Sequence, residues 1–89
     1  MRFYKATRKF WQDYKELSPE QKVRVKEKFR LFKSDPFHPS LRSHTITKLS
    51  AHAKHPIYSA VIEGNLRVIF RIDGNVVTTI TMGTHDVYK

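Results

Sequence analysis

Apolar positions near the N-terminus change from an alternating to a helical spacing. Residues 2–5 alternate apolar and polar side chains, which predicts a short strand at the edge of a sheet. After Thr7, which can cap a helix, the apolar residues fall on one helical face. That face contains Phe10, Trp11, Tyr14 and Leu17. The pattern therefore predicts an edge strand followed by an amphipathic helix.

A second helix has a clearer start. Ser18 occupies the cap position, Pro19 the first helical position, and Gln21 lies three residues after the cap. The apolar stripe of this helix contains Val25, Phe29 and Phe32. Asp35 precedes Pro36, and this pair disfavours further helix. Because about one turn residue separates the two helices, we expect an antiparallel helical hairpin.

The second half of the chain alternates with the period of β-strands. The predicted strands cover residues 44–49, 57–62, 66–72 and 76–82. A proline-containing connection at 36–43 and a polar loop at 50–56 flank the first of them. Loops containing glycine, at 63–65 and 73–75, join the last three as hairpins. We therefore predict a single α+β domain over residues 1–89. Its N-terminal strand and helical hairpin pack on one face of a mainly antiparallel four-stranded sheet.

The phase of the strand at 66–72 assigns its side chains to the two faces of the sheet. Its even-numbered apolar residues alternate with Arg67, Ile69 and Arg71, and must face the helices because strand side chains alternate with period two. With three-residue hairpin loops, Ile72 pairs with Val76, Val68 with Ile80, and Leu66 with Met82. The opposite side, here called the distal face, then carries Arg67, Arg71, His44, Ile46, Lys48, Thr79, Thr81, Gly83 and His85. This predicts a concave cationic surface that contains imidazoles.

The composition indicates what such a surface binds. Seventeen Lys and Arg against eight Asp and Glu give a net charge of +9, which favours nucleic acid, an acidic protein partner, or both. The absence of cysteine excludes disulfides, thiolate nucleophiles and cysteine-based zinc sites. No stretch approaches the ~18 apolar residues of a membrane span, so we expect a cytoplasmic protein without a membrane partner.

The distal face has the parts that metal-free RNA cleavage requires. The reaction needs a base near the 2′-OH, a cation beside the developing phosphorane charge, and an acid for the 5′-oxygen. Histidine titrates near neutral pH, and arginine is permanently cationic and binds phosphate bidentately. His38, His52 and His55 lie in connections, where we expect bystanders. Because no carboxylates accompany them in a metal-ligand pattern, we expect neither a metal site nor a cofactor.

Three segments resemble the RelE/ParE superfamily of toxins. They are residues 35–44 (DPFHPSLRSH), 65–71 (NLRVIFR) and 83–88 (GTHDVY), in the family's order of helices and strands. The resemblance implies the toxin of a type II toxin–antitoxin system, silenced by a cognate antitoxin that wraps it. The chain looks most like the RelE-like branch and its YafQ-type toxins. That implies a metal-independent endoribonuclease that cleaves mRNA on the ribosome and so inhibits translation.

The resemblance also implies roles for single residues. Arg67 matches the sheet arginine that contacts the scissile phosphate, and His85 matches the C-terminal histidine of the YafQ-type toxins. Tyr88 lies near a terminal tyrosine that stacks or assists proton transfer, and Lys48 and His44 correspond to basic residues of the second strand. We further predict that RNA is bound by Arg71, Arg42 and Lys54.

Two other functions stay open at this point. A ParE-like toxin would share the fold but poison DNA gyrase and have no nuclease site. A toxin homologue without nuclease activity would only bind antitoxin.

Overall fold

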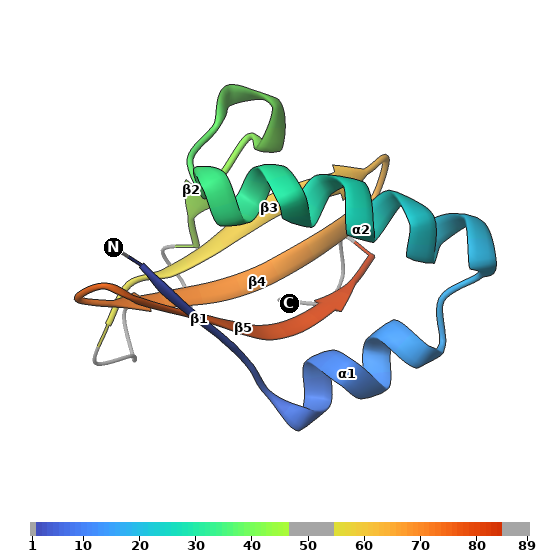
Figure 1. Cartoon of the computed structure of the whole chain (residues 1–89), viewed down its shortest axis with the longest axis horizontal. Coiled ribbons are helices and arrows are strands. Elements are labelled where there is room, and N and C mark those ends of the chain that lie inside the picture. Colours follow the sequence, from blue (N-terminus) through green and yellow to red (C-terminus); the bar gives the residue numbers. More distant parts are fainter. Residues whose placement is uncertain (1, 47–54, 85–89) are drawn as a thin grey trace.

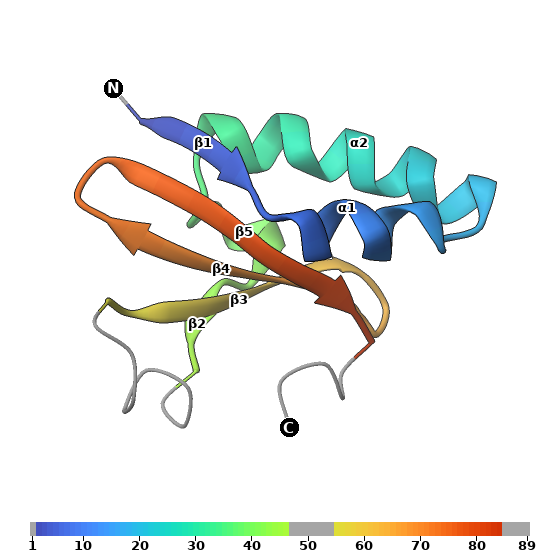
Figure 2. The ribbon, with the colours of Figure 1, turned by 90° about the horizontal axis from the view of Figure 1, so that it is seen from below.

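The computed structural model describes residues 2–46 and 55–84. Its elements in chain order are β1 (Phe3–Ala6), α1 (Arg8–Lys15), α2 (Pro19–Ser34), the short 3₁₀ helix η1 (Pro39–Leu41), β2 (His44–Thr45), β3 (Ile57–Glu63), β4 (Leu66–Asp73) and β5 (Val76–Gly83). The strands form one sheet in the order β1-β5-β4-β3-β2 (Figure 1). Both α-helices lie on the same side of this sheet (Figure 2). The predicted α+β class, with the helices on one face, is confirmed.

The sheet has five strands, because β1 joins it as an edge strand. β1 runs parallel to β5, and the Phe3 N–H donates to the Asn75 carbonyl (2.8 Å) while the Thr7 N–H donates to the Thr79 carbonyl (3.0 Å). The other neighbouring strands are antiparallel. The sheet is therefore mainly antiparallel, as predicted, with one strand more than the predicted four.

The helices begin where the sequence predicts. At the start of α1, the Thr7 side chain accepts a hydrogen bond from the Phe10 N–H. At the start of α2, Ser18 Oγ accepts from the Gln21 N–H, and the Gln21 side chain accepts from the Ser18 N–H. This reciprocal cap satisfies backbone donors that a first helical turn leaves free. No helix in the described part of the chain is long and apolar enough to cross a membrane.

The core lies between the helices and the centre of the sheet. Phe32 of α2 and Phe70 of β4 are fully buried and meet edge to face, with ring centroids 4.9 Å apart. Phe10 of α1 and Val25 of α2 are buried in the same cluster. Burying a side chain of this size stabilises a fold by about 1.5–3 kcal/mol. The apolar faces that the sequence predicts are therefore the faces that meet.

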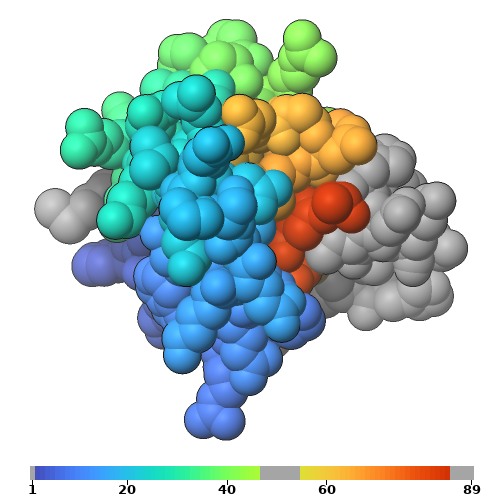
Figure 3. All heavy atoms as spheres, turned by 90° about the vertical axis from the view of Figure 1, so that its right-hand side faces the viewer, coloured from blue at the N-terminus to red at the C-terminus, as the bar shows by residue number. Residues whose placement is uncertain are grey.

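The two helices diverge from their short connection. Residues 16–18 join them, and Figure 3 views the molecule from the end at which this connection lies. α1 packs against β5, whereas α2 packs against β3. The predicted helical hairpin is thus open, and a groove remains between α1, α2 and β1.

The hairpin loops are shorter than predicted, which changes the register of β5. Gly74 and Asn75 alone turn the chain between β4 and β5, and Gly74 has a φ of 59°, which suits glycine at the first position of a two-residue turn. The β3–β4 turn is built in the same way from Gly64 and Asn65. Ile72 consequently pairs with Val77, where a three-residue loop would have paired it with Val76.

This one-residue shift turns the first half of β5 over, because side chains alternate between faces. Val77 and Thr79 face the helices and are 0% and 4% exposed. The prediction that Thr79 lies on the distal face is therefore wrong. Its hydroxyl instead donates to the Lys5 carbonyl of β1 (3.2 Å).

A bulge at Ile80 corrects the phase of the second half of β5. Phe70 pairs with Thr79 and the next pair is Ile69 with Thr81, so Ile80 is the extra residue. Val68 then pairs with Met82 and not with Ile80 as predicted. Met82 is buried in the core, as its predicted face required.

Asp13 of α1 holds the end of β5 beside this bulge. Its Oδ2 accepts hydrogen bonds from the Thr81 hydroxyl (2.5 Å) and the Met82 N–H (3.0 Å), and its Oδ1 accepts one from Lys9 Nζ. Burial alone would raise the pKa of this carboxyl, but the hydrogen bonds outweigh burial, and the pKa of Asp13 lies below its ordinary value. The Thr81 hydroxyl, predicted for the distal face, is thus bound to α1.

We predict that Asp13→Asn lowers the free energy of unfolding at pH 7 by about 1.5–3 kcal/mol, the usual contribution of hydrogen bonds to a charged group. Because folding depresses this pKa, the stabilisation is complete above the pKa of the unfolded carboxyl, about 3.9, and is lost as pH falls through the folded value. Urea unfolding of the wild type and of Asp13→Asn should show that the difference between their free energies of unfolding becomes smaller as pH falls from 7 to 2.

The matched control is Glu27→Gln, which removes an exposed carboxylate that pairs with Arg24. It should change the free energy of unfolding by less than about 0.5 kcal/mol. A difference between wild type and Asp13→Asn that stays constant with pH would contradict the role of the charged carboxylate.

Candidate nucleic-acid interface

Alternate residues of β4 lie on the distal face of the sheet. Arg67, Ile69 and Arg71 share this face, whereas Val68 and Phe70 are buried against the helices. Four residues of extended strand place the Cα atoms of the two arginines about 13 Å apart. Their spacing in the sequence therefore predicts their common face correctly.

The centre of the distal face is apolar. Ile46, Ile57 and Ile69 form a buried cluster, and Ile80 of the bulge packs against it. Ile69 is only 2% exposed. The sequence predicts a cationic surface here, whereas the structure has an isoleucine cluster with Arg67 toward one end of β4 and Arg71 toward the other.

Arg67 is half-buried and lies opposite Val61 of β3 and Gly83 of β5. Its Nε is buried and has no hydrogen-bond partner among the described residues, and the same holds for the Oγ of Ser59, on the neighbouring strand. A buried donor without an acceptor costs about 1–3 kcal/mol. An anionic oxygen placed beside Arg67 would remove that cost.

His44 lies in the same cross-strand row as Ile69. It pairs with Ser59 of β3, which in turn pairs with Ile69 of β4, so its side chain belongs to the distal face. Two strand spacings put its backbone about 10 Å from β4. Its Nδ1 lies 3.1 Å from the carbonyl of Arg42. Because a carbonyl only accepts, Nδ1 carries the proton in this contact, which leaves the lone pair of a neutral ring on Nε2.

Two other histidines have structural partners. His55 Nε2 lies 3.4 Å from Asp73 Oδ2, at the end of β4 beyond Arg71. His38 Nδ1 accepts a hydrogen bond from the Ser40 N–H (3.2 Å) and caps η1. Within residues 2–46 and 55–84, no three His, Asp or Glu side chains gather as metal ligands would.

Comparisons with known proteins bear on the fold. No family model and no curated protein matches the chain. Among solved structures, the archaeal RelE–RelB complex from Pyrococcus horikoshii OT3 matches with a TM-score of 0.74 over 97% of each chain, at 13% identity. The E. coli DinJ–YafQ toxin–antitoxin complex matches with a TM-score of 0.76 over 99% of this chain and 98% of that chain, at 15% identity. The YoeB/ParE toxin from Agrobacterium tumefaciens matches with a TM-score of 0.70 over 96% of this chain and 99% of that chain, at 19% identity.

The chain has the RelE/ParE toxin fold. The likeness that the sequence motifs indicate is thereby confirmed for the arrangement of helices and strands. It extends over nearly the whole length of the chain.

The RelE/ParE toxin fold places part of the predicted site on one face of the sheet. Arg67, Arg71 and His44 share the distal face, and the exposed Arg42 precedes β2 with a left-handed backbone (φ 49°). The other predicted site residues, Lys48, Lys54, His85 and Tyr88, lie outside the described residues, as does His52.

Two features, one in the site and one in the scaffold that supports β5, were missing from the sequence interpretation. In the sequence, Ser59 is a single polar residue within an apolar strand. Only its pairing with His44 on one side and Ile69 on the other shows that it lies between β2 and β4. Asp13 has a sequence signal only toward Lys9, four residues before it. Its partners on β5 come together through the bulge, which no spacing in the sequence predicts.

We predict that Ser59→Ala leaves the free energy of unfolding unchanged or raises it by up to about 1 kcal/mol, because it removes a buried hydroxyl that has no partner among the described residues. The matched control is Ser43→Ala, whose hydroxyl donates to the Pro36 carbonyl (2.6 Å). That change should cost about 1 kcal/mol. Thermal unfolding of both variants tests this, and a loss of stability in Ser59→Ala as large as in Ser43→Ala would show that the Ser59 hydroxyl is satisfied.

Proposed function

We propose that the chain is the toxin of a type II toxin–antitoxin pair and an endoribonuclease that cleaves mRNA on the ribosome without a metal. The observation that carries this proposal is the distal face, where Arg67, Arg71 and His44 project from the same side of the sheet in a fold shared with known toxins. A net charge of +9 supports a polyanionic target.

The proposed reaction divides the RNA backbone at one phosphate. A base removes the proton of the 2′-OH, the 2′-oxygen bonds to phosphorus, and the bond from phosphorus to the 5′-oxygen breaks. An acid then gives a proton to the departing 5′-oxygen. Negative charge grows on the phosphate oxygens at the midpoint, so a fixed cation there lowers the barrier.

Arg67 is the residue that we assign to this charge. Arginine side chains bind phosphate oxygens bidentately, and the buried Nε of Arg67 has no acceptor among the described residues. A phosphate oxygen would supply that acceptor. The free energy that the unpaired Nε–H costs the free protein would be recovered when the phosphate binds. The same hydrogen bond would stabilise the negative charge that develops on the phosphate oxygens during the reaction.

Proton transfer is assigned to His44 and to residues beyond the described part of the chain. With Nδ1 held by the Arg42 carbonyl, neutral His44 presents an Nε2 lone pair to a 2′-OH. By resemblance, His85 and Tyr88 complete the acid–base set and Lys48 adds a cation. Arg71, Arg42 and Lys54 are assigned to the flanking phosphates, where they bind without reading sequence.

The proposal predicts that induced expression of the chain stops translation, with cleaved mRNA appearing within minutes. Primer extension on a reporter message would locate the cuts, and a parallel assay would score double-strand DNA breaks. An uninduced culture and the Arg67→Ala protein are the controls. Broken DNA together with intact mRNA would contradict the proposal and favour a gyrase poison of the ParE type. Intact DNA and RNA with translation continuing would favour a homologue that only binds antitoxin.

A second prediction concerns single residues. Arg67→Ala and His85→Ala should each lower ribosome-dependent cleavage by about 10²–10⁴-fold, the usual effect of losing a charge stabiliser or a proton-transfer group. Cleavage by each purified variant is measured beside a thermal melt, because Arg67 is half-buried and its variant must be shown to fold.

Arg30→Ala and His52→Ala are the matched controls, since each removes one side chain of the same type elsewhere in the chain. Both should cleave at the wild-type rate. Normal cleavage by folded His85→Ala would remove that imidazole from the mechanism. Normal cleavage by Arg67→Ala would show that the distal face is not the site.

A further inference from the structure

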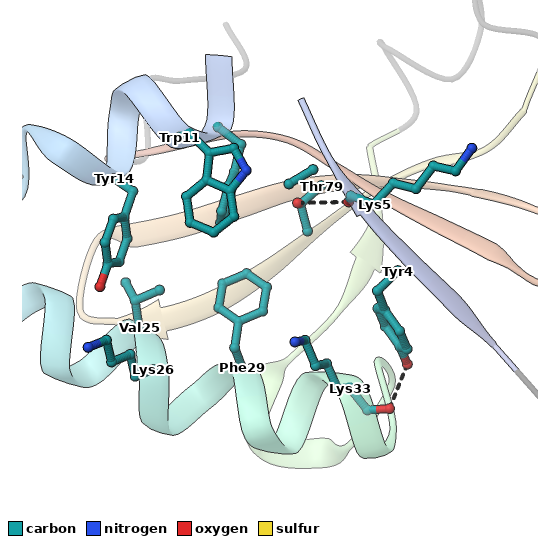
Figure 4. Close-up of a pocket in the computed structure, with 11 residues that line it drawn as sticks. Tyr4, Lys5, Trp11, Tyr14, Val25, Lys26, Phe29, Lys33 and Thr79 are labelled. Carbon is teal, nitrogen blue, oxygen red and sulfur yellow. Dashed lines mark hydrogen bonds between the residues drawn. The ribbon is translucent and has the colours of Figure 1, made fainter. Parts of the chain in front are cut away.

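The last four residues of β5, 80–83, extend beyond the end of β1. The pairing of β1 with β5 stops where Ala6 meets Thr79, so none of the described strands lies beside residues 80–83 on that side. Up to this point a side chain reinforces the pairing, because the Thr79 hydroxyl donates to the Lys5 carbonyl (Figure 4). The backbone groups of a strand edge need other partners. Those partners determine how the end of β5 lies.

The helix α1 supplies the partners that β1 does not. At its start, Thr7 donates its hydroxyl to the carbonyl of Ile80, the extra residue of the bulge (2.5 Å). Nearly two turns later, Asp13 accepts hydrogen bonds from the Thr81 hydroxyl and the Met82 N–H. The helix is therefore bonded to three consecutive residues of β5, and one carboxylate makes two of these bonds.

The carboxylate of Asp13 is itself held in place. Its side chain is only 11% exposed, and its Oδ1 accepts from Lys9 Nζ, one turn earlier in α1. Both carboxylate oxygens are thus bonded, and hydrogen bonds to a charged group are roughly twice as strong as those between neutral groups. Asp13 is therefore a rigid attachment between α1 and the end of β5.

The strand end that Asp13 holds meets the candidate site. Because the Met82 N–H points toward α1, the N–H of the next residue, Gly83, points toward β4, where Gly83 pairs with Arg67. Arg67 is the residue that we assign to the phosphate. His85, assigned to proton transfer by resemblance, follows Met82 by three residues, which span at most about 11 Å of chain.

We propose that Asp13 is a positioning residue for RNA cleavage, which rests on the proposed function for the reaction itself. A carboxylate repels phosphate, so Asp13 acts through β5 and not by contact with RNA. It keeps the end of β5 against α1, and with it Gly83 opposite Arg67 and the start of the segment that contains His85. A misplacement of about 1 Å can lower a rate by about 10²-fold. Asp13 therefore acts on the chemical step, while the arginines assigned to flanking phosphates bind RNA without it.

The test separates turnover from binding. Asp13→Ala removes the carboxylate, and kcat and KM are measured for cleavage of a ribosome-bound message by the full chain. We expect kcat to fall by about 10–100-fold while KM changes by less than about threefold. The matched control is Lys9→Ala, which removes a partner of Asp13 but leaves both bonds to β5. Its kcat should stay within about threefold of the wild type.

A second control measures the effect of stability alone. Phe32→Leu loosens the core beneath α2 and lowers the melting temperature, far along the sheet from the end of β5. It should keep the wild-type kcat at a temperature at which thermal melts show every variant folded. If Asp13→Ala does not fold, Thr81→Val replaces it, because this change removes only the hydroxyl that donates to the carboxylate. Its kcat should fall in the same way.

NMR relaxation of the backbone amides gives a readout without RNA. In Asp13→Ala, the order parameter of the Gly83 N–H should fall from the ~0.85 of rigid backbone to below ~0.6, while that of Val68 in the core stays near ~0.85. Phe32→Leu should change neither value. A rigid Gly83 in Asp13→Ala, or an equal loss of kcat in Phe32→Leu, would overturn the proposal.

The kinetic results also separate this inference from the proposed function. A wild-type chain that cleaves no RNA would contradict the proposed function. A wild-type chain that cleaves RNA beside an equally active, folded Asp13→Ala would contradict only the role of Asp13.

Discussion

The period-two alternation of side chains along β4 is the constraint on which the rest of the structure depends. β4 lies between β3 and β5, and its Val68 and Phe70 are fully buried against the helices. The intervening Arg67 and Arg71 must then project from the distal face. A slip of one residue would place two guanidinium groups in the core and cost several kcal/mol for each charge. The packing that stabilises the fold thus also fixes the cations of the candidate site.

This coupling explains why much of the fold could be predicted from the sequence. The capping residues Thr7 and Ser18 bond to backbone groups three residues away, so a short stretch of sequence is enough to predict them. The side of the sheet on which Arg67 lies follows from the alternation of apolar and polar residues within β4 itself. The parallel pairing of β1 and the register of β5 depend instead on contacts between distant residues. A glycine in a loop allows turns of two or three residues, and the difference of one residue reversed the predicted face of Thr79.

The groove between α1, α2 and β1 and the distal face lie on opposite sides of the same sheet, and β5 contributes to both. Thr79 lines the groove on the helix side, whereas Ile80, the next residue, packs on the distal face beside Ile69. Adjacent residues of a strand face opposite sides of its sheet, and the extra residue of the bulge then returns Met82 to the core side. Asp13 stabilises the strand just after the bulge from α1, one of the two helices that form the groove. The groove and the candidate site are therefore lined by different side chains, and substitutions can separate their roles.

Mapping the RNA-binding surface by NMR would show whether RNA contacts the distal face. The six isoleucines divide between the two sides of the sheet: Ile46, Ile57, Ile69 and Ile80 cluster on the distal face, while Ile62 and Ile72 belong to the core beneath the helices. NMR spectra of their labelled methyl groups would be recorded during titration with a 2′-O-methyl RNA oligonucleotide, which lacks the attacking hydroxyl and stays intact. If RNA binds the distal face, the methyl signals of the four distal isoleucines shift, while those of Ile62 and Ile72 stay unchanged. Shifts confined to Ile62 and Ile72, or RNA binding that moves none of the six, would contradict it.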